Sequence, residues 1–204
     1  HPKHDFEMLY FNSDGIESSL CGNGARCIVN FAFNLGIISE KTDFIAIDGL
    51  HQANLIDSDV SVKFNDISKI ELENNNMVID SGSPHFIILH EDIDHININN
   101  EARKIRNSKK YKSEGINVNF VNIDDVISIR TYERGVEAET LSCGTGAVAT
   151  AVGLHYSKNI EDNIIELNTK GGVLTVSFDE FNGCYKNIWL TGSVNLVYIG
   201  EFEC

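Results

Sequence analysis

Cys21-Gly22-Asn23-Gly24-Ala25 opens one helix-like segment of this chain, and Cys143-Gly144-Thr145-Gly146-Ala147 opens another. The segments that follow, 24–35 and 146–156, are apolar on nearly every side, so we expect both to be helices buried on all sides. The shared Cys-Gly-x-Gly-Ala pattern recurs at a separation of 143 − 21 = 122 positions, which indicates an internal duplication. We therefore predict an α+β fold of two similar halves. Each half is expected to be a mostly antiparallel sheet wrapped around a central buried helix, with the active site in the cleft between the halves.

Most of the remaining sequence alternates short apolar segments with turn residues, which is typical of strands. The strands expected from this pattern are 6–11, 43–47, 52–56, 60–64, 77–80, 86–89, 118–123, 126–132, 164–168, 173–178, 187–191 and 194–199. A third helix-like segment, 99–107, is charged and belongs on the surface. We expect residues 1–72 to form the first half, with 195–204 returning to it, and residues 73–194 to form the second.

Composition and charge exclude several classes of protein. The chain has 204 residues, 42% of them hydrophobic, which suffices for one sizeable core or for two cores that share an interface. Its formal charge of −14 argues against a nucleic acid or an anionic membrane as partner, because phosphate binding needs clustered Lys and Arg. No apolar run approaches the roughly 18 residues that a transmembrane helix needs.

The cysteines indicate free thiols rather than disulfides or a metal site. Their number, five, is odd, and a chain of this size does not need cross-links, so we expect reduced thiols and a cytoplasmic protein. Cys21 and Cys27 lack the CxxC spacing and second pair of a structural zinc site, and no metal is expected. Cys27 falls on another face of its helix and is expected in the core, whereas Cys184 and Cys204 show no partner motif.

A cysteine at the start of a helix is placed for reactivity. The first N–H groups of a helix have no intrahelical partner, and the helix dipole places partial positive charge there. That environment stabilises a thiolate, and the neighbouring N–H groups can hold a carboxylate. The glycines of the pattern let the backbone approach a ligand closely.

Two such cysteines suit the inversion of a carbon centre. One would remove a proton as thiolate, and the other would donate a proton to the opposite face. Two helix N-termini aimed at the substrate carboxylate would stabilise the carbanion formed beside it. Taken singly, a cysteine is more often a small buried hydrophobe and a Gly-x-Gly an ordinary turn. Packing gives no reason to repeat both, and papain-type catalysis, which uses one Cys with a His, leaves the second copy unexplained.

Four sequence motifs follow one another in order along nearly the whole chain. The first is Phe11-Asn12-Ser13-Asp14-Gly15 followed by Cys21-Gly22-Asn23-Gly24-Ala25-Arg26-Cys27, and the fourth is Tyr132-Glu133-Arg134-Gly135 followed by Glu139-Thr140-Leu141-Ser142-Cys143-Gly144-Thr145-Gly146-Ala147. Between them stand Gly82-Ser83-Pro84-His85 and Gly115-Ile116-Asn117-Val118-Asn119-Phe120. Together the four motifs resemble those of the diaminopimelate epimerase family, and the resemblance covers nearly the whole chain.

The resemblance implies a cofactor-independent isomerase that interconverts LL- and meso-diaminopimelate, with Cys21 and Cys143 as the catalytic acid–bases. It places His85 beside Cys21 and Glu133 beside Cys143, where each accepts a thiol proton. The remaining residues that it implies bind substrate: the backbone at Gly22, Asn23, Gly144 and Thr145 for the α-carboxylate, and Arg134, Asn12, Asn117 and Ser83 for the distal end.

The chain also departs from the family. Ser83 stands where the family usually has Asn, which shortens the reach of one distal hydrogen bond. The family's opening segment, with a G-N-D-F-like motif and a later Gln, has no counterpart before His1, so the first half is expected to be incomplete. Two alternatives stay open: a proline racemase-like isomerase, which would leave Arg134 idle, and an inactive fragment of the scaffold. The expected partner is a small amino-acid substrate, and a homodimer is left open.

Overall fold

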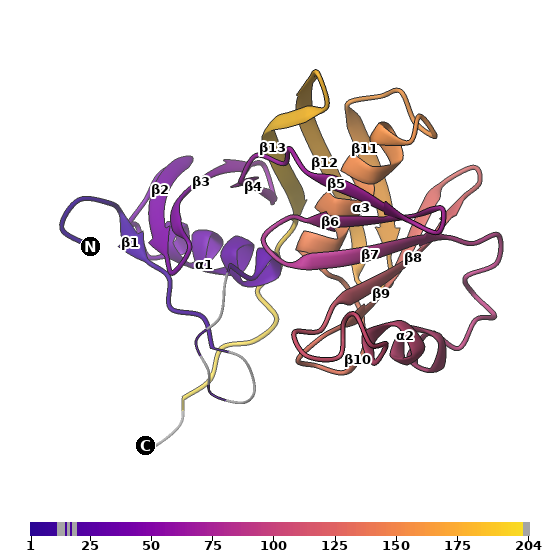
Figure 1. Ribbon diagram of the computed structural model, residues 1–204. Helices are drawn as coiled ribbons and strands as arrows, with labels where there is room; N and C mark the ends of the chain where they lie inside the picture. The colour runs from indigo at the N-terminus through magenta and orange to yellow at the C-terminus, as the bar shows by residue number, and fades with distance from the viewer. Residues whose placement is uncertain (12–14, 16, 18–19, 202–204) are drawn as a thin grey trace.

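One mixed sheet of thirteen strands runs through the part of the chain that the computed structural model describes, residues 1–11, 15, 17 and 20–201 (Figure 1). The strands are β1 (Phe6–Glu7), β2 (Lys41–Ala46), β3 (Gly49–Ile56), β4 (Asp59–Phe64), β5 (Ile70–Glu73), β6 (Asn76–Asp80), β7 (Pro84–Leu89), β8 (Asn117–Ile123), β9 (Ile127–Glu133), β10 (Ala138–Thr140), β11 (Ile164–Thr169), β12 (Gly172–Phe181) and β13 (Cys184–Ser193). Their order is β1-β2-β3-β4-β13-β12-β11-β9-β8-β7-β6-β5, with β10 paired to β9. Most pairs are antiparallel, as expected; β1–β2, β7–β8 and β9–β11 are parallel.

Three helices accompany the described strands: α1 (Gly22–Asn34), α2 (Ile98–Arg106) and α3 (Gly144–Tyr156). All three expected helices are confirmed, each within two residues of its expected start. The Cys-Gly-x-Gly-Ala pattern acts as a helix start in both copies, because Cys21 and Cys143 have extended backbones and are the N-caps of α1 and α3. Gly36, with a φ of +70°, adopts the left-handed conformation just beyond the end of α1.

The two pseudo-repeat helices differ in how far they are enclosed. α3 packs against β6, β7, β8, β11, β12 and β13, and ten of its residues are buried, so its expected burial on all sides is confirmed. For α1 that expectation is wrong: the helix packs on β3, β4 and the start of α3, and its other face carries the exposed Phe31, Phe33 and Leu35. Cys27, expected in the core, lies on that open face and is exposed.

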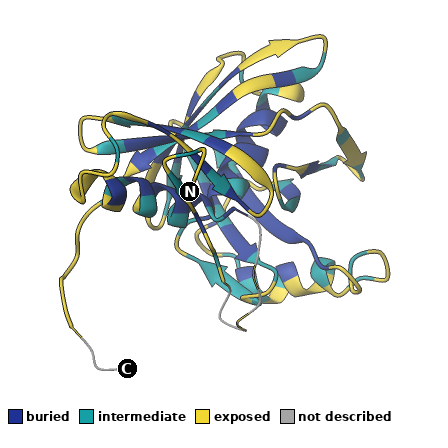
Figure 2. Ribbon diagram, turned by 90° about the vertical axis from the view of Figure 1, so that its left-hand side faces the viewer, coloured by how far each residue is buried: buried dark blue, intermediate teal, exposed yellow. Residues whose placement is uncertain are grey.

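The chain end after β13 also departs from expectation. The sequence predicted a strand over 194–199, but β13 ends at Ser193 and residues 194–201 have no regular structure. Val194 packs on the core, and the residues after it extend from the body as an exposed tail (Figure 2). Alternating apolar residues form a strand only where a partner strand takes their backbone hydrogen bonds, and no described strand pairs with this segment. Likewise, of the expected strand 6–11 only Phe6–Glu7 is in the sheet.

One large hydrophobic core joins the regions around α1 and α3. It contains Ala25 and Val29 of α1 together with Ala147, Val148 and Val152 of α3. The antiparallel pair β4–β13 makes the sheet continuous between the two regions. The division into halves at 72/73 stays a prediction; that boundary falls within β5, which pairs with β6.

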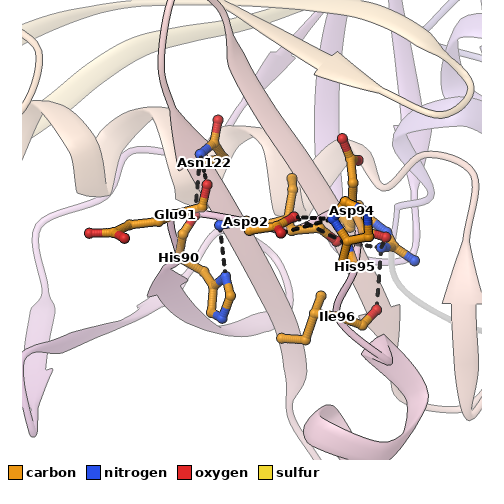
Figure 3. A network of polar contacts seen from close by, with 9 residues as sticks. His90, Glu91, Asp92, Asp94, His95, Ile96 and Asn122 are labelled. Carbon is orange, nitrogen blue, oxygen red and sulfur yellow. Dashed lines mark hydrogen bonds and ion pairs between the residues drawn. The ribbon is translucent and has the colours of Figure 1, made fainter.

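A polar loop over 90–96 connects β7 to the segment that leads into α2 (Figure 3). The Asn122 side-chain amide donates to the Glu91 carbonyl at 2.7 Å, and Asp92 contacts the His95 ring at 2.8 Å. These contacts fix the loop against β8, and α2 follows it directly. No helix among the described residues has the length and apolar character needed to cross a membrane.

Candidate active site

The two helix-start cysteines line one cavity of about 390 Å³. It lies where α1 and α3 begin, so the two N-termini share one polar space. Its lining residues are Tyr10, Leu20, Cys21, Gly22, Asn23, Ser83, Arg106, Glu114, Asn117, Glu133, Arg134, Gly135, Glu137, Ser142, Cys143, Gly144 and Thr145. Of the residues that the sequence singled out, ten therefore meet here; His85 lies outside the lining, and Asn12 lies outside the described residues.

Glycine is required where the helix starts meet. A Cβ added to Gly22 would lie 3.2 Å from the Gly144 Cα, and one added to Gly144 would lie 3.1 Å from the Gly22 Cα. Leu190 of β13 packs on both positions, with its Cδ2 at 3.3 and 2.9 Å from the two added carbons. Cβ contacts of 3.0–3.4 Å are tighter than most, and contacts under 3.0 Å essentially do not occur, so a side chain at either position would push the neighbouring backbone or Leu190 aside.

Cys21 is half-buried at the start of α1. The Gly24 N–H donates to its Sγ at 3.4 Å, which satisfies one N–H of the first turn. Tyr10 lines the cavity close by, and its pKa is raised to about 12 by burial and by the nearby negative charge of a Cys21 thiolate. The Tyr10 hydroxyl therefore keeps its proton at neutral pH and offers a donor to this side of the cavity.

Cys143 is buried at the start of α3, with 8% of its surface exposed. Burial, followed by the negative charge of Glu133, raises the pKa of its thiol to about 12. The group is accordingly protonated at neutral pH. Its Sγ lies 3.4 Å from the Thr145 Oγ1.

His85, on β7, is fully buried beneath the cavity, and burial lowers its pKa to about 3. The Asn119 amide donates to the Gly146 carbonyl and to Thr150, so its Oδ1 accepts from Nδ1–H of His85 at 3.2 Å. The imidazole is then neutral with a free electron pair on Nε2, which lies 2.9 Å from the Thr145 Oγ1. A hydrogen-bonded series therefore runs from the Cys143 thiol through the Thr145 hydroxyl to His85. These contacts connect His85 to the Cys143 side, whereas the resemblance implied a place beside Cys21.

Glu133 and Arg134 stand where β9 ends, at the cavity wall. The Glu133 carboxylate accepts a hydrogen bond from Thr140 at 2.5 Å, and its charge acts on Cys143. The Arg134 backbone N–H donates to the Asn117 Oδ1 at 2.9 Å, and its guanidinium donates to the Glu114 carbonyl at 3.0 Å. Asn117 in turn donates to the Ser83 hydroxyl at 2.9 Å. Asn117 and Ser83 thus support each other at the cavity end that Arg134 lines.

Sequence reasoning missed Arg106 of α2, a second cation at the cavity. Its Nε donates to Glu137 at 3.1 Å, and Gly115 approaches its guanidinium closely. It also missed Tyr10, although that residue directly precedes the Phe11-Asn12 motif. Asn119, which orients His85, was quoted within a motif but not selected. Arg106 carries no sequence signal, because it comes from a surface helix that only the tertiary fold brings here.

Comparison of the fold with solved structures defines the class of protein. A probable proline racemase from Agrobacterium radiobacter superposes with a TM-score of 0.69 at 15% identity, covering 95% of this chain and 70% of that one. A PhzF-family phenazine biosynthesis protein from Bacillus anthracis gives a TM-score of 0.71 at 15% identity, covering 95% and 79%. The chain therefore has the fold that these proteins share.

Sequence comparison specifies the family within that fold. The family model described as Diaminopimelate epimerase matches residues 77–197. The diaminopimelate epimerase of Flavobacterium psychrophilum is 45% identical over 95% of this chain and 77% of its own length, and that of Aquifex aeolicus is 37% identical over 100% and 76%. The chain belongs to the diaminopimelate epimerase family.

Proposed function

We propose that this protein interconverts LL- and meso-diaminopimelate by moving one proton at the α-carbon, with two thiols and no cofactor. The observation that carries the proposal is that Cys21 and Cys143, 122 positions apart, line one cavity at two helix N-termini in a chain of this family. The cavity is small and polar, and the Arg134 guanidinium lies at one end of it. This arrangement fits an amino acid with a second charged end.

The two thiols have different roles at rest. Because Cys143 is held as a thiol, we assign it the initial acid, and we assign Cys21 the initial base. Cys21 as thiolate removes the α-proton from one face, and the Cys143 S–H delivers a proton to the other. To reset the site, the thiolate left on Cys143 takes a proton from solvent and the Cys21 thiol releases its proton to solvent; in the reverse reaction the roles exchange.

The carbanion intermediate is stabilised by the helix starts. Gly22, Asn23, Gly144 and Thr145 line the shared cavity and stand in the first turns of α1 and α3, where backbone N–H groups have no intrahelical partner. Charge that spreads from the α-carbon into the α-carboxylate meets these preorganised dipoles, which stabilise the transition state more than the ground state.

Recognition of the far end of the substrate falls to the other side of the cavity. Arg134 is placed to pair with the distal carboxylate, and a guanidinium can do so through two parallel hydrogen bonds. Asn117, Ser83 and Asn12 complete that end as hydrogen-bonding groups. Glu133 accepts a proton on the Cys143 side. We place the enzyme in the cytoplasm, consistent with its need for two reduced thiols.

The direct test is incorporation of solvent deuterium at the α-carbon of diaminopimelate. Wild-type protein in D₂O should label the substrate, and Cys21→Ser and Cys143→Ser should each lower the rate by about 10²- to 10⁴-fold. Cys27→Ser and Cys184→Ser serve as matched controls and should keep the wild-type rate. Unchanged labelling in both catalytic variants would refute thiol catalysis. Turnover of proline instead of diaminopimelate would show that the protein is a proline racemase-like enzyme.

A further inference from the structure

Arg26 is a buried cation of α1 for which the reaction gives no direct role. Only 6% of its surface is exposed, and its Nε is the one buried side-chain nitrogen or oxygen of the described residues without a hydrogen-bond partner. It takes part in none of the ion pairs found among those residues. Burial of a guanidinium without an ion-paired carboxylate is unfavourable; here burial lowers the Arg26 pKa, although the charges of Cys27, Cys21 and Asp59 act in the opposite direction. The groups that the guanidinium holds must account for its presence.

The Arg26 guanidinium binds the first turn of its own helix. Nη1 donates to the Gly22 carbonyl at 3.3 Å, and Nη2 donates to the Asn23 Oδ1 at 2.7 Å. Both acceptors belong to the Cys21-Gly22-Asn23 start that lines the cavity. The guanidinium packs against Gly192 of β13, where there is no side chain to collide with it. A Cβ added to Gly192 would lie 3.2 Å from the Arg26 Nε and 3.3 Å from its Cζ.

Arg26 also determines which way the Asn23 amide points. A guanidinium has donors and no acceptor, so the atom of Asn23 that faces it must be the oxygen. The amide nitrogen consequently faces the opposite way, where it donates to the Ser142 carbonyl at 3.0 Å. That carbonyl belongs to the peptide bond that joins Ser142 to Cys143. The hydrogen bonds therefore lead from Arg26 through Asn23 to the residue before the second cysteine.

We propose that Arg26 is a positioning residue, which fixes the separation and mutual orientation of Cys21 and Cys143 through the Asn23 amide and the Ser142 carbonyl group. The inference rests on the proposed function for its catalytic consequence, but its geometric content can be measured without substrate.

Only the α1 copy of the repeated pattern carries the residues of this hydrogen-bonded connection. Aligning Cys21 with Cys143 aligns Asn23 with Thr145 and Arg26 with Val148. Val148 is fully buried and apolar, and Thr145 contacts His85 and Cys143 rather than α1. Because the α3 start offers no equivalent bridge, loss of Arg26 should be felt directly in the geometry of the thiol pair.

The geometric test uses dibromobimane, which fluoresces after both of its bromomethyl groups have reacted. Each of two neighbouring thiolates displaces one bromide, so the rate of fluorescence reports whether Cys21 and Cys143 can be bridged. The full chain carrying Cys27→Ser, Cys184→Ser and Cys204→Ser provides the background. In it, Arg26→Met should slow bridging by about 10-fold or more, whereas the exposed Arg103→Met, a matched loss of an arginine, should leave the rate unchanged.

The kinetic test separates positioning from general destabilisation. At a temperature where all variants are folded by circular dichroism, Arg26→Met should lower kcat by about 10- to 100-fold, because small misplacements of reacting groups have effects of that size. Its KM should change by less than about 3-fold. Arg26→Lys, which keeps the charge but lacks the fork, should recover only part of kcat. The double variant Arg26→Met/Asn23→Ala should lose no more than the worse single variant, because both act on one connection.

The outcomes are distinguishable from those of the proposed function. If Arg26→Met bridges the two thiols at the wild-type rate, the positioning role is overturned whatever the activity. Full recovery of kcat in Arg26→Lys overturns it as well, because the positive charge alone would then explain the effect of Arg26. If the wild-type chain labels no diaminopimelate, the proposed function fails, while the bridging comparison still decides the role of Arg26.

Discussion

The starts of α1 and α3 share a sequence pattern but provide different surroundings for their cysteines. Cys21 is half-buried and receives an N–H from Gly24, while Arg26 and Tyr10 stand near it. Cys143 is buried with Glu133 and Thr145 beside it, and its pKa is raised to about 12. The difference follows from the enclosing elements, since strands cover α3 on all sides and α1 on one.

This difference teaches how a duplicated motif can yield two distinct chemical groups. The helix dipole and the first-turn N–H groups are common to both copies, so both can hold one carboxylate between them. Burial and neighbouring charges are not shared: Cys143 is the more enclosed of the two, and burial with the charge of Glu133 raises the pKa of its thiol. A near-symmetric scaffold thus holds two cysteines in unlike surroundings.

The largest expected effect tests the unequal enclosure of the two helices. Leu154→Ala, in the buried part of α3, should lower the free energy of unfolding by about 2–5 kcal/mol, because it leaves a cavity in a packed core. Leu35→Ala, at the 58% exposed C-cap of α1, should cost less than about 0.5 kcal/mol. Urea unfolding of both variants gives the comparison, and equal losses would contradict an open face on α1.

The next effect concerns the contact that joins the two starts. Gly144→Ala places a methyl group 2.9 Å from the Leu190 Cδ2 and 3.1 Å from the Gly22 Cα, so the Leu190 side chain has to move and the two helix starts are pushed apart by a few tenths of an ångström. We expect a loss of about 1–3 kcal/mol in stability from overpacking and a fall in kcat of up to about 10²-fold. Gly183→Ala is not a suitable control, because Gly183 has a φ of +77°. Gly200, where an added Cβ meets only the Tyr198 ring at 3.7 Å, is suitable, and Gly200→Ala should change neither quantity.

A smaller effect tests the hydroxyl that has no counterpart at the α1 start. Thr145→Val keeps the shape of the side chain and removes the group between the Cys143 thiol and His85. We expect kcat to fall by about 10-fold with little change in KM, while Thr145→Ser retains most of the activity. Steady-state kinetics with diaminopimelate decide this, and equal rates for the Val and Ser variants would show that the hydroxyl does not orient the Cys143 thiol.

The most gradual effect is the pH dependence that His85 imposes on the α3 side, which is small within any one pH unit. Its pKa is about 3 in the folded protein and near the ordinary 6.5 when unfolded, so the unfolded chain binds the extra proton between these values. The free energy of unfolding should therefore fall as pH drops below about 6.5, by at most about 1.4 kcal/mol per pH unit from this group. His85→Gln should flatten that part of the curve in urea titrations at several pH values, and parallel curves would refute the assignment.

Much of the fold followed from local patterns in the sequence. The helix α3, apolar on every side, was predicted with its burial, and most strands were found from alternating residues between turns. The strand expected over 194–199 failed because a strand also needs a partner, which no local pattern specifies. The prediction that α1 is buried on all sides failed for a related reason. Phe31 and Leu35 are apolar, but nothing in the described residues covers them.

Prediction of the site was uneven in the same way. Most residues selected from the family motifs line the cavity, among them Cys21, Cys143, Glu133 and Arg134, while their roles stay predictions. His85 was selected, but its contacts lie on the Cys143 side, because β7 passes under α3. Arg106 was missed because no motif includes it, and only the tertiary fold brings α2 to the cavity.

The sequence by itself determined that two cysteines stand at helix starts, because the cap, the glycines and the apolar run are local features read within a few residues. It also determined the family, through four motifs in order. Only the tertiary structure decided which thiol is buried as an acid, which face of α1 is open, and how Arg26 connects to the opposite cysteine. Those properties depend on solvent exposure and on charges from distant segments, which exist only after the sheet has brought its strands together.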